Sequence, residues 1–434
     1  MTNHSAAQLA FGKQAEIVQD GSSVSVASLH ERATGLAASL QPYGRVAICT
    51  ARTDSLALAM VACTIGQIEL LLLRQPSMFN TSSLAVYGVD ALLHDDGRIE
   101  PTQISKMRSR EFMLLLATSG TTGEPKIARH RLNRLTGRIR APSHGSDAGT
   151  WLLTYHPASF AGIQVILSTL IGGGRLLACS EPTVANLAIM AADFLPTHIS
   201  ATPTFWRALL MMLGDRAVDI PLRRITLGGE PVDQGILDRL GRLYPRAGIT
   251  HIYASTEAGA LFAVHDKRSG FPSSWLNEPV DGVRFRIRDG VLEVMSPRSS
   301  LGYQGDRVRI PYSDDGWLIT NDLVEAQDDR VLFQGRVDSV INVGGAKVTP
   351  DEVERCLLSI PGVMDARAYA VPSPITGSLV GASICIAPGY LEKEMRPTIN
   401  KTLRSALDPY KVPRLIEFVD AMEISETGKK SRQS

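Results

Sequence analysis

Short apolar runs alternate with longer amphipathic segments over roughly the first 280 residues of the chain. The run "GRVAICT" (44–50) has the length and composition of a buried strand. The segment "DSLALAMVACTIG" (54–66) has a helical pattern that begins at an Asp suited to an N-cap and ends at a glycine. The same order recurs at 160–179, where a helix closed by glycines precedes the strand-like "RLLAC". Alternation of this kind predicts an α/β protein with mostly parallel sheets.

The pattern changes near residue 280. The segment "VRFRIRDGVLEVMS" alternates on both sides of Asp289-Gly290, a pair typical of a tight hairpin, and 330–343 is also rich in strand formers. A small antiparallel sheet is therefore predicted here. From about residue 338 an amphipathic helix, further strands and a second helix indicate a separate α+β unit. We predict a large N-terminal domain, residues 1–337, and a small C-terminal domain, residues 338–434.

Composition excludes several classes of protein. The chain has 45 Lys plus Arg against 44 Asp plus Glu, so a net charge of +1 gives no indication of a nucleic-acid partner. Five scattered cysteines without a CxxC pair are typical of reduced thiols. The longest apolar stretch, 55–73, is interrupted by Gly66, Gln67 and Glu69, which favours a buried helix and strand over a membrane span. With no signal peptide recognisable, a cytoplasmic location is expected.

The segment "ATSGTTGEPK" (117–126) has the inventory of a phosphate-binding loop. Glycines let the backbone approach an anion closely, the Ser and Thr hydroxyls can donate hydrogen bonds, and Lys126 adds a positive charge. A nucleoside triphosphate fits this inventory. The segment is not a Walker A motif, because Pro125 precedes the lysine where that motif requires glycine. Composition alone is equally compatible with a polar surface turn.

The segment resembles the phosphate loop of the adenylate-forming superfamily, which includes acyl-CoA synthetases, aryl-acid ligases and carrier-loading adenylation domains. Further segments resemble this family's motifs and occur in the family's order: "THISATPTFWRALL" (197–210), "LGGEPV" (227–232), "IYASTEAG" (252–259), "GWLITNDLVE" (316–325), "GRVDSVINVGGAKVTPDEVE" (335–354) and "DPYKVPRLIEFVDAMEISETGKKSR" (408–432). The resemblance implies an ATP-binding domain followed by a small mobile domain.

The resemblance also implies a role for each matching residue. The residues expected to surround the β- and γ-phosphates of ATP are Thr118, Ser119, Gly120, Thr121, Thr122, Gly123 and Lys126. Gly229 and Glu230 would border the adenine, and Tyr253 would stack on it. Thr256 would contact the α-phosphate, and Glu257 would hold Mg²⁺.

The later motifs imply the ribose site, the hinge and a catalytic lysine. Asp322 would accept hydrogen bonds from both ribose hydroxyls, a task that suits a carboxylate. Arg336 would add a ribose or phosphate contact, and Asp338 would be the hinge between the domains. Lys429 would reach the acyl carboxylate and the α-phosphate. Its neighbour Lys430 matches the motif less well, because the spacing to Arg432 favours Lys429.

The acid pocket is expected around residues 156–165, 203–207, 228–230 and 252–259. Its candidate residues are His156, Phe160, Gly228 and Ala254. A lone histidine near apolar residues is often structural, and Phe205 and Trp206 are expected in a helix core. Ala254 stands where the family usually has glycine, so its methyl group favours a small or medium acyl or aryl substrate. Asn321 also replaces a usual glycine and tolerates a positive φ.

The expected reaction joins a small carboxylic acid to a thiol in two steps. ATP activates the acid to an acyl-AMP with release of pyrophosphate, and the acyl group then passes to coenzyme A. The alternative acceptor is the phosphopantetheine thiol of an acyl carrier protein, and a non-catalytic nucleotide-binding relative is the alternative of another class. Six Lys and Arg residues between 126 and 140 are compatible with a solvated helix face or with an anion-steering patch.

Overall fold

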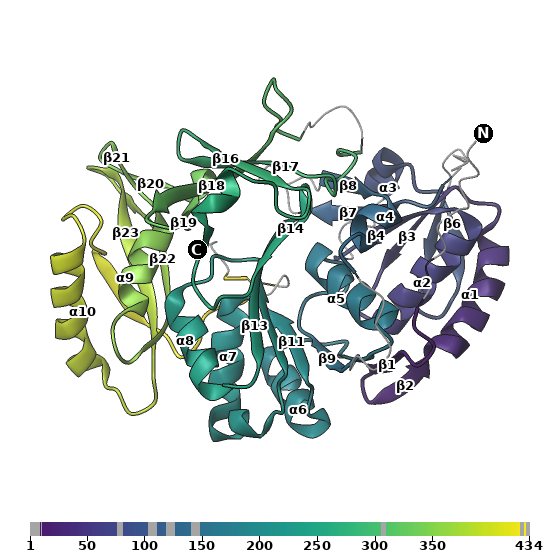
Figure 1. The fold of residues 1–434 in the computed structure, drawn as a ribbon, viewed down its shortest axis with the longest axis horizontal. Helices are drawn as coiled ribbons and strands as arrows, with labels where there is room; N and C mark the ends of the chain where they lie inside the picture. Colours follow the sequence, from purple (N-terminus) through teal and green to yellow (C-terminus); the bar gives the residue numbers. More distant parts are fainter. Residues whose placement is uncertain are drawn as a thin grey trace.

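The computed structural model describes residues 9, 11–75, 81–102, 111–118, 126–139, 148–304, 310–425 and 429–430. An N-terminal domain of layered sheets and helices is followed by a C-terminal α+β domain, and the two lie side by side (Figure 1). Within these ranges, no helix has the length and apolar character needed to cross a membrane.

An eight-stranded, mostly parallel sheet forms the centre of the N-terminal domain, with strand order β14-β13-β12-β11-β9-β10-β1-β2. Only its two edge strands, β2 and β14, pair antiparallel to their neighbours. The strands are β1 (Glu16–Gln19), β2 (Ser22–Ser25), β9 (Thr150–Leu153), β10 (Arg175–Ala178), β11 (His198–Ala201), β12 (Arg224–Gly228), β13 (Gly248–Ser255) and β14 (Gly259–Val264). The parallel sheet predicted from the alternating pattern is confirmed.

A second sheet of six strands has the order β6-β5-β3-β4-β7-β8 and is parallel except at its edges. Its strands are β3 (Arg45–Cys49), β4 (Glu69–Leu73), β5 (Ala91–Leu93), β6 (Ile99–Pro101), β7 (Leu114–Thr118) and β8 (Lys126–His130). The antiparallel pair β7–β8 places Thr118 opposite Lys126, so both ends of the predicted phosphate loop are fixed beside each other.

Helices fill the space between these sheets and cover their outer faces (Figure 1). Between the sheets lie α1 (Val26–Leu40), α2 (Thr53–Gly66) and α5 (Phe160–Ile171), and α4 (Leu132–Thr136) packs on α5. The outer face of the larger sheet carries α6 (Val184–Phe194), α7 (Pro203–Leu213) and α8 (Gln234–Leu243), whereas α3 (Thr81–Tyr87) packs on the smaller sheet.

Strand β4, apolar except for Glu69, which pairs with the buried Arg45, shows why these layers form. Its side chains alternate between two cores, with Leu70 and Leu72 facing α2 and Leu71 and Leu73 facing α3. A strand buried on both faces is mostly apolar, as is usual in parallel sheets, and a buried charge such as Glu69 needs a paired partner. The N-cap of helix α2 is Arg52, two residues before the predicted cap, and Asp54 lies in the first turn, where its carboxylate pairs with Arg52 at 2.7 Å. The prediction of Asp54 as the cap is therefore wrong.

The predicted antiparallel sheet is confirmed, with strand order β15-β19-β18-β17-β16. Its strands are β15 (Phe271–Pro272), β16 (Arg284–Arg288), β17 (Val291–Met295), β18 (Leu318–Gln327) and β19 (Arg330–Arg336). Asp289 and Gly290 have φ values of 52° and 74° and form the tight turn between β16 and β17. Among the described residues, the short 3₁₀ helices are η2 (Gly214–Asp219), η3 (Ser273–Leu276) and η4 (Val337–Ser339), and the last contains Asp338.

The C-terminal domain has a sheet and a hydrophobic core of its own. Its elements are β20 (Ile341–Val343), β21 (Ala346–Val348), α9 (Pro350–Leu358), β22 (Val363–Ser373), β23 (Gly377–Ile386), α10 (Glu392–Ala406) and β24 (Leu415–Phe418). The α+β character predicted for this part of the chain is confirmed. A boundary at residue 337/338 and the mobility of the domain stay predictions.

Phe262 of β14 joins the eight-stranded sheet to the antiparallel sheet. Its ring is fully buried and lies 4.9–5.4 Å from the rings of Tyr253, Phe271, Trp275 and Phe285. We expect Phe262→Ala to lower the free energy of unfolding by about 3 to 5 kcal/mol, because it leaves a cavity in this cluster. Urea denaturation measures the change. Ile375→Ala, at a side chain that is 91% exposed, is the control and should stay within about 0.5 kcal/mol.

Candidate active site

A cavity of about 1710 Å³ opens at the carboxyl ends of the parallel strands of the larger sheet. Ser200, Gly228 and Ser255, from β11, β12 and β13, lie on its wall together with residues of the antiparallel sheet and of the C-terminal tail. In open α/β sheets this end of the strands is where ligands bind. The position of the cavity therefore follows from the topology.

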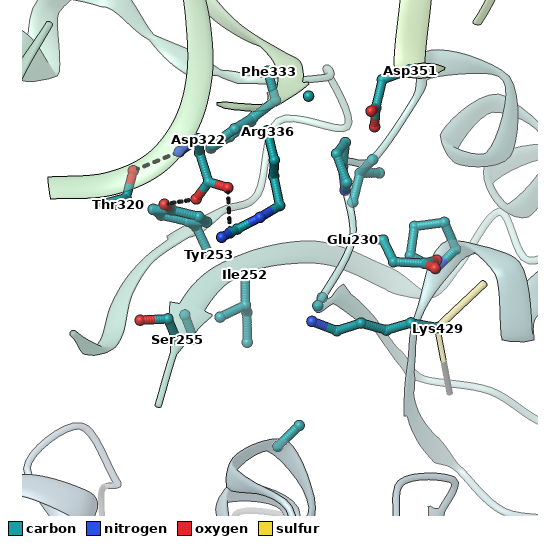
Figure 2. A pocket seen from close by; sticks show the side chains of 18 of the residues that line it. Glu230, Ile252, Tyr253, Ser255, Thr320, Asp322, Phe333, Arg336, Asp351 and Lys429 are labelled. Carbon is teal, nitrogen blue, oxygen red and sulfur yellow. Dashed lines mark hydrogen bonds and ion pairs between the residues drawn. The ribbon is translucent and has the colours of Figure 1, made fainter. Parts of the chain in front are cut away.

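Tyr253, Asp322 and Arg336 form a connected group on one wall of the cavity (Figure 2). The Tyr253 hydroxyl donates to one oxygen of the Asp322 carboxylate, and Nη1 of Arg336 donates to the other at 3.0 Å. The Tyr253 ring packs between Phe262 and Phe333, with centroids at 5.3 and 4.9 Å. A carboxylate thus faces the cavity beside an aromatic ring that the hydrophobic core holds in place.

The surroundings of Asp322 shift the pKa of its carboxyl group in opposing directions. Burial raises the pKa of its carboxyl group, while Arg336 and the Tyr253 hydroxyl oppose that rise. Its backbone N–H donates to the Thr320 hydroxyl at 3.1 Å, and Asn321, with a φ of 63°, makes the turn between these two residues. The sequence indicated only that asparagine tolerates an unusual φ here, and the positive φ of Asn321 agrees with that. Asp322 therefore presents its carboxylate at a defined angle to the cavity.

A second group on the cavity wall contains Lys126, Glu257 and Tyr303. The Tyr303 hydroxyl donates to Oε1 of Glu257 at 2.7 Å, and Nζ of Lys126 lies 5.7 Å from the centre of the Tyr303 ring. Tyr303 also forms a β-bridge with Ala128 of β8. Burial and the Glu257 carboxylate raise the pKa of Tyr303, so the hydroxyl keeps its proton and remains a donor. This group places a carboxylate and an ammonium at the end of the predicted phosphate loop.

Glu230 connects the N-terminus of α7 to the C-terminal tail. One carboxylate oxygen accepts from the backbone N–H of Thr204 at 3.1 Å, and the other accepts from the backbone N–H of Lys430 at 2.8 Å. The N-terminus of a helix favours negative charge, and Thr202 caps α7 through its own hydroxyl. Both oxygens of Glu230 are therefore engaged in holding the cavity wall together.

Lys429 extends into the same cavity (Figure 2). A Cβ atom on Gly229 would lie 3.5 Å from Cε of this lysine, so the side chain crosses the glycine turn after β12. The residue is exposed to the open cavity, and residues of several elements lie around its side chain. Burial and Arg336 lower its pKa, whereas Glu230, Asp322 and Glu257 oppose that shift. One lysine thus faces three carboxylates from separate elements.

The structure brings most of the predicted site residues to this cavity. Its wall includes Lys126, Phe160, Gly228, Gly229, Glu230, Tyr253, Ala254, Thr256, Glu257, Asp322, Arg336, Asp338 and Lys429. Thr118 ends β7, and nothing is described of its side chain. Ser119, Gly120, Thr121, Thr122 and Gly123 lie outside the described residues.

His156 is the exception among the predicted pocket residues. It is buried, and its Nδ1 accepts a hydrogen bond from the backbone N–H of Ala158 at 3.1 Å, in the turn before α5. Phe160 lines the cavity, but His156 does not. Its position therefore gives no support to a role as a gate. Phe205 and Trp206 are buried in the core of α7, as expected.

The basic run after Lys126 is largely committed to contacts inside the protein. Arg131 pairs with Glu111 at 3.0 Å, and Arg138 pairs with Asp281 at 2.6 Å. Arg134 donates to the carbonyl oxygen of Ser299. These arginines, on α4 and directly next to it, contact segments distant in the sequence, which neither of the two alternatives proposed from the sequence foresaw.

Several residues of the site were not identified from the sequence. Tyr303 and Phe333 lie outside the segments that resemble the family's motifs, whereas Thr320 and Thr204 lie inside such segments but had no predicted role; each lines the cavity and contacts a predicted residue or its ring. The contacts of Tyr303, Phe333 and Thr204 join residues far apart in the chain, and no local pattern marks them. Only Thr204 lay within a range predicted for the acid pocket.

Comparison with protein families agrees with this geometry. Residues 72–302 match the model of the AMP-binding enzyme family, and residues 352–429 match the model of the AMP-binding enzyme C-terminal domain. The chain belongs to the AMP-binding enzyme family. The predicted membership of the adenylate-forming superfamily is thereby confirmed.

Curated relatives of the chain are acid ligases. A medium/long-chain-fatty-acid–acyl-carrier-protein ligase of Mycobacterium tuberculosis is 26% identical over 361 residues, which is 75% of this chain and 66% of that protein. A 4-hydroxybutyrate–CoA ligase of Metallosphaera sedula is 27% identical over 353 residues, covering 74% of this chain and 61% of that protein. The chain therefore matches somewhat less than two thirds of the length of these two relatives.

Solved structures share the fold. The anthranilate CoA ligase AuaEII in complex with anthranoyl-AMP superposes with a TM-score of 0.77 at 17% identity, covering 98% of this chain and 92% of that one. A benzoate CoA ligase from Burkholderia xenovorans LB400 has a TM-score of 0.77 at 19% identity, covering 99% and 97%. At these identities the likeness shows the fold alone, and it extends over both domains.

The Tyr253 hydroxyl should contribute measurably to stability. We expect Tyr253→Phe to lower the free energy of unfolding by about 1.5 kcal/mol, the lower end for a hydrogen bond to a charged group, because cavity water partly replaces the hydroxyl. Chemical denaturation measures the loss. Tyr369→Phe is the matched control, since its hydroxyl donates to an exposed Glu417 at 3.3 Å and should contribute little. Equal losses in the two variants would contradict the role given to the Asp322 contact.

Proposed function

We propose that the protein activates a carboxylic acid with ATP and transfers the acyl group to the thiol of coenzyme A. The observation that supports this function is the convergence of Lys126, Glu257, Asp322 and Lys429 on one cavity, from both ends of the chain. An adenylation site must neutralise two anionic reactants, and here the cationic groups face the cavity beside carboxylates that can bind a metal ion and a ribose.

In the first step, an oxygen of the substrate carboxylate attacks the α-phosphorus of ATP. The bond between this phosphorus and the bridging oxygen of the β-phosphate breaks, and pyrophosphate leaves. Lys429 would hold the carboxylate against the α-phosphate and balance the charge that develops there, with Thr256 as a neighbouring donor. Lys126 would bind the leaving phosphates together with the loop 118–123. Asp322 and Arg336 would hold the ribose, and Tyr253, Gly229 and Glu230 would border the adenine.

Glu257 is proposed to hold Mg²⁺. Among the described residues, no three His, Cys, Asp or Glu side chains gather into a site that binds a metal by protein groups alone. Mg²⁺ commonly takes one or two carboxylates together with phosphate oxygens and water. Glu257 and Lys126 both contact Tyr303, so Glu257 lies near the predicted phosphate loop. It therefore fits a metal ion whose coordination would be completed by phosphate oxygens. The ion would neutralise phosphate charge during adenylation.

In the second step, the sulfur of the thiol attacks the acyl carbon of the acyl-AMP. The bond from this carbon to the AMP oxygen breaks, AMP leaves, and the thiol proton passes to solvent. Lys429 occupies the cavity in the present arrangement, which suits the first step. We propose that the C-terminal domain rotates about Asp338 before the second. Asp338 lies in the short η4 turn between the last strand of the antiparallel sheet and β20, a position where a few residues can absorb a rotation.

The thiol of an acyl carrier protein is the second candidate acceptor. It is favoured by relatives that are named acyl-carrier-protein ligases, among them a fatty-acid ligase of Mycobacterium marinum that is 26% identical over 389 residues. The substrate pocket remains assigned to Phe160, Gly228 and Ala254, and the Ala254 methyl group on the cavity wall favours a small or medium acyl or aryl acid.

The direct test is acid-dependent release of pyrophosphate. Purified protein is incubated with ATP and Mg²⁺ against aryl, short-chain and medium-chain acids, with and without coenzyme A. We expect release with one class of acid, turnover that requires coenzyme A, and a loss of at least a hundredfold in Lys429→Ala, because transition-state charge is then unbalanced. Adenylation without turnover on coenzyme A would indicate a carrier protein. ATP binding without release for any acid in the panel would support the non-catalytic alternative.

The pH dependence of adenylation should report Lys429. Its ammonium form is the active one, and its pKa is lowered below the ordinary value of 10.5. The rate should therefore fall as the pH rises, with a midpoint below 10.5. Lys429→Arg keeps its charge throughout this range, so whatever activity it retains should lack the falling limb. An unchanged alkaline limb in this variant would assign the limb to another group.

A further inference from the structure

Two neighbouring lysines of the C-terminal tail have opposite surroundings. The ammonium of Lys429 faces the cavity, whereas the side chain of Lys430 is only 8% exposed. Nζ of Lys430 lies 3.0 Å from Asp365 and 3.2 Å from Glu354, and it also donates to the carbonyl oxygen of Ala366. A buried ammonium with three oxygen partners holds this part of the tail in place.

Both acidic partners are as buried as the lysine. The side chains of Glu354 and Asp365 are 8% and 7% exposed, so each is poorly solvated without a positive partner. Burial opposes the charge on Lys430, but Glu354 and Asp365 outweigh it and raise its pKa above the ordinary value. The contact is therefore charged at any pH at which the enzyme would work.

Asp365 also faces the N-terminal domain. Nη1 of Arg207, on α7, lies 3.9 Å from Oδ1 of Asp365, and the Arg207 side chain is 7% exposed. Arg207 pairs in addition with Asp233, in the loop before α8. Helix α7 packs against β22, the strand that carries Asp365. One buried row of charges thus crosses from one domain to the other.

The backbone of residue 430 is held from the N-terminal side as well. Its N–H donates to Glu230 at 2.8 Å, and Glu230 is anchored on the N-terminus of α7. The tail is further fixed by a β-bridge between Ile424 and Lys430. Residue 430 therefore has its side chain bound in the C-terminal domain and its backbone bound to the N-terminal domain, directly next to Lys429.

We propose that Lys430 is the positioning residue for Lys429. Its ammonium, bound by Glu354 and Asp365, and its backbone, bound by Glu230, fix the register in which residue 429 enters the cavity. The Arg207–Asp365 contact links this position of residue 429 to the present arrangement of the two domains. This inference rests on the proposed function, in which Lys429 acts during adenylation.

The test measures ATP–pyrophosphate exchange with the acid identified in the panel. We expect Lys430→Met to lower kcat about a hundredfold, the effect of a displacement of about 1 Å at a reacting group, with little change in the KM for ATP. Lys430→Arg should recover part of the loss because it restores the charge. Lys411→Met is the control: Lys411 pairs with Glu352 at 2.8 Å on the same domain, and its loss should leave kcat unchanged.

The double variant Lys429→Ala/Lys430→Met separates positioning from general structure. If Lys430 acts through Lys429, the double variant is as slow as Lys429→Ala alone, because the group to be positioned is already gone. Losses that multiply would overturn the proposal. Asp365→Asn provides the same test without altering residue 430, should the methionine variant fail to fold: it should lower kcat, leave the KM for ATP unchanged, and add nothing to Lys429→Ala.

A chemical readout keeps this proposal distinct from the proposed function. Reductive methylation followed by mass spectrometry gives the reactivity of Lys429 without any turnover, and the exposed Lys393 is the internal reference. In Lys430→Met, the ratio of the Lys429 rate to the Lys393 rate should change severalfold from its wild-type value, because the side chain of Lys429 leaves its surroundings in the cavity. If no acid supports exchange in the wild type, the proposed function fails while this measurement still stands. An unchanged Lys429 rate in Lys430→Met would overturn the positioning role.

Discussion

Three carboxylates, Glu230, Glu257 and Asp322, face one cavity, and the rest of the site is arranged to make that possible. Like charges in a shared, partly enclosed space repel each other unless donors and cations hold them. Each carboxylate has its own partner from another element: the N-terminus of α7 for Glu230, Tyr303 for Glu257, and Tyr253 with Arg336 for Asp322. Lys429 then adds one cation that acts on all three.

The layered fold supplies the rigidity that this arrangement requires. Parallel strands β12 and β13 end at one edge of the sheet, so Gly228 and Ser255 reach the cavity from strands whose other face packs in a hydrophobic core. The aromatic cluster around Phe262 then joins that sheet to the antiparallel sheet that carries Asp322. Residues nearly 70 positions apart, such as Tyr253 and Asp322, thereby meet at hydrogen-bond distance. Charged groups in the cavity are held by apolar packing behind them.

Local pattern and ordered motifs predicted much of this. Alternating apolar runs anticipated the parallel sheets, Asp289-Gly290 anticipated the hairpin, and the motif order anticipated which residues share the cavity. Contacts between distant segments were not predictable in this way. Tyr303 has no local signature, because its role depends on β8 and Glu257 arriving beside it. From the sequence, Lys430 cannot be told from a solvated lysine of the tail, because only the structure shows its buried partners Glu354 and Asp365. Arg131 and Arg138 likewise have partners that periodicity does not reveal.

One arginine, Arg336, connects Asp322 to the predicted hinge residue Asp338. Arg336 donates to both, at 3.0 Å in each case, and it ends the strand that leads into the η4 turn. A ribose that engages Asp322 would compete for the carboxylate that Arg336 now shares, and any shift of Arg336 is transmitted over two residues to the predicted hinge. The proposed ribose site and the proposed hinge are therefore connected through Arg336. Under that proposal, a difference in ribose-binding free energy between two domain arrangements would bias the rotation about the hinge.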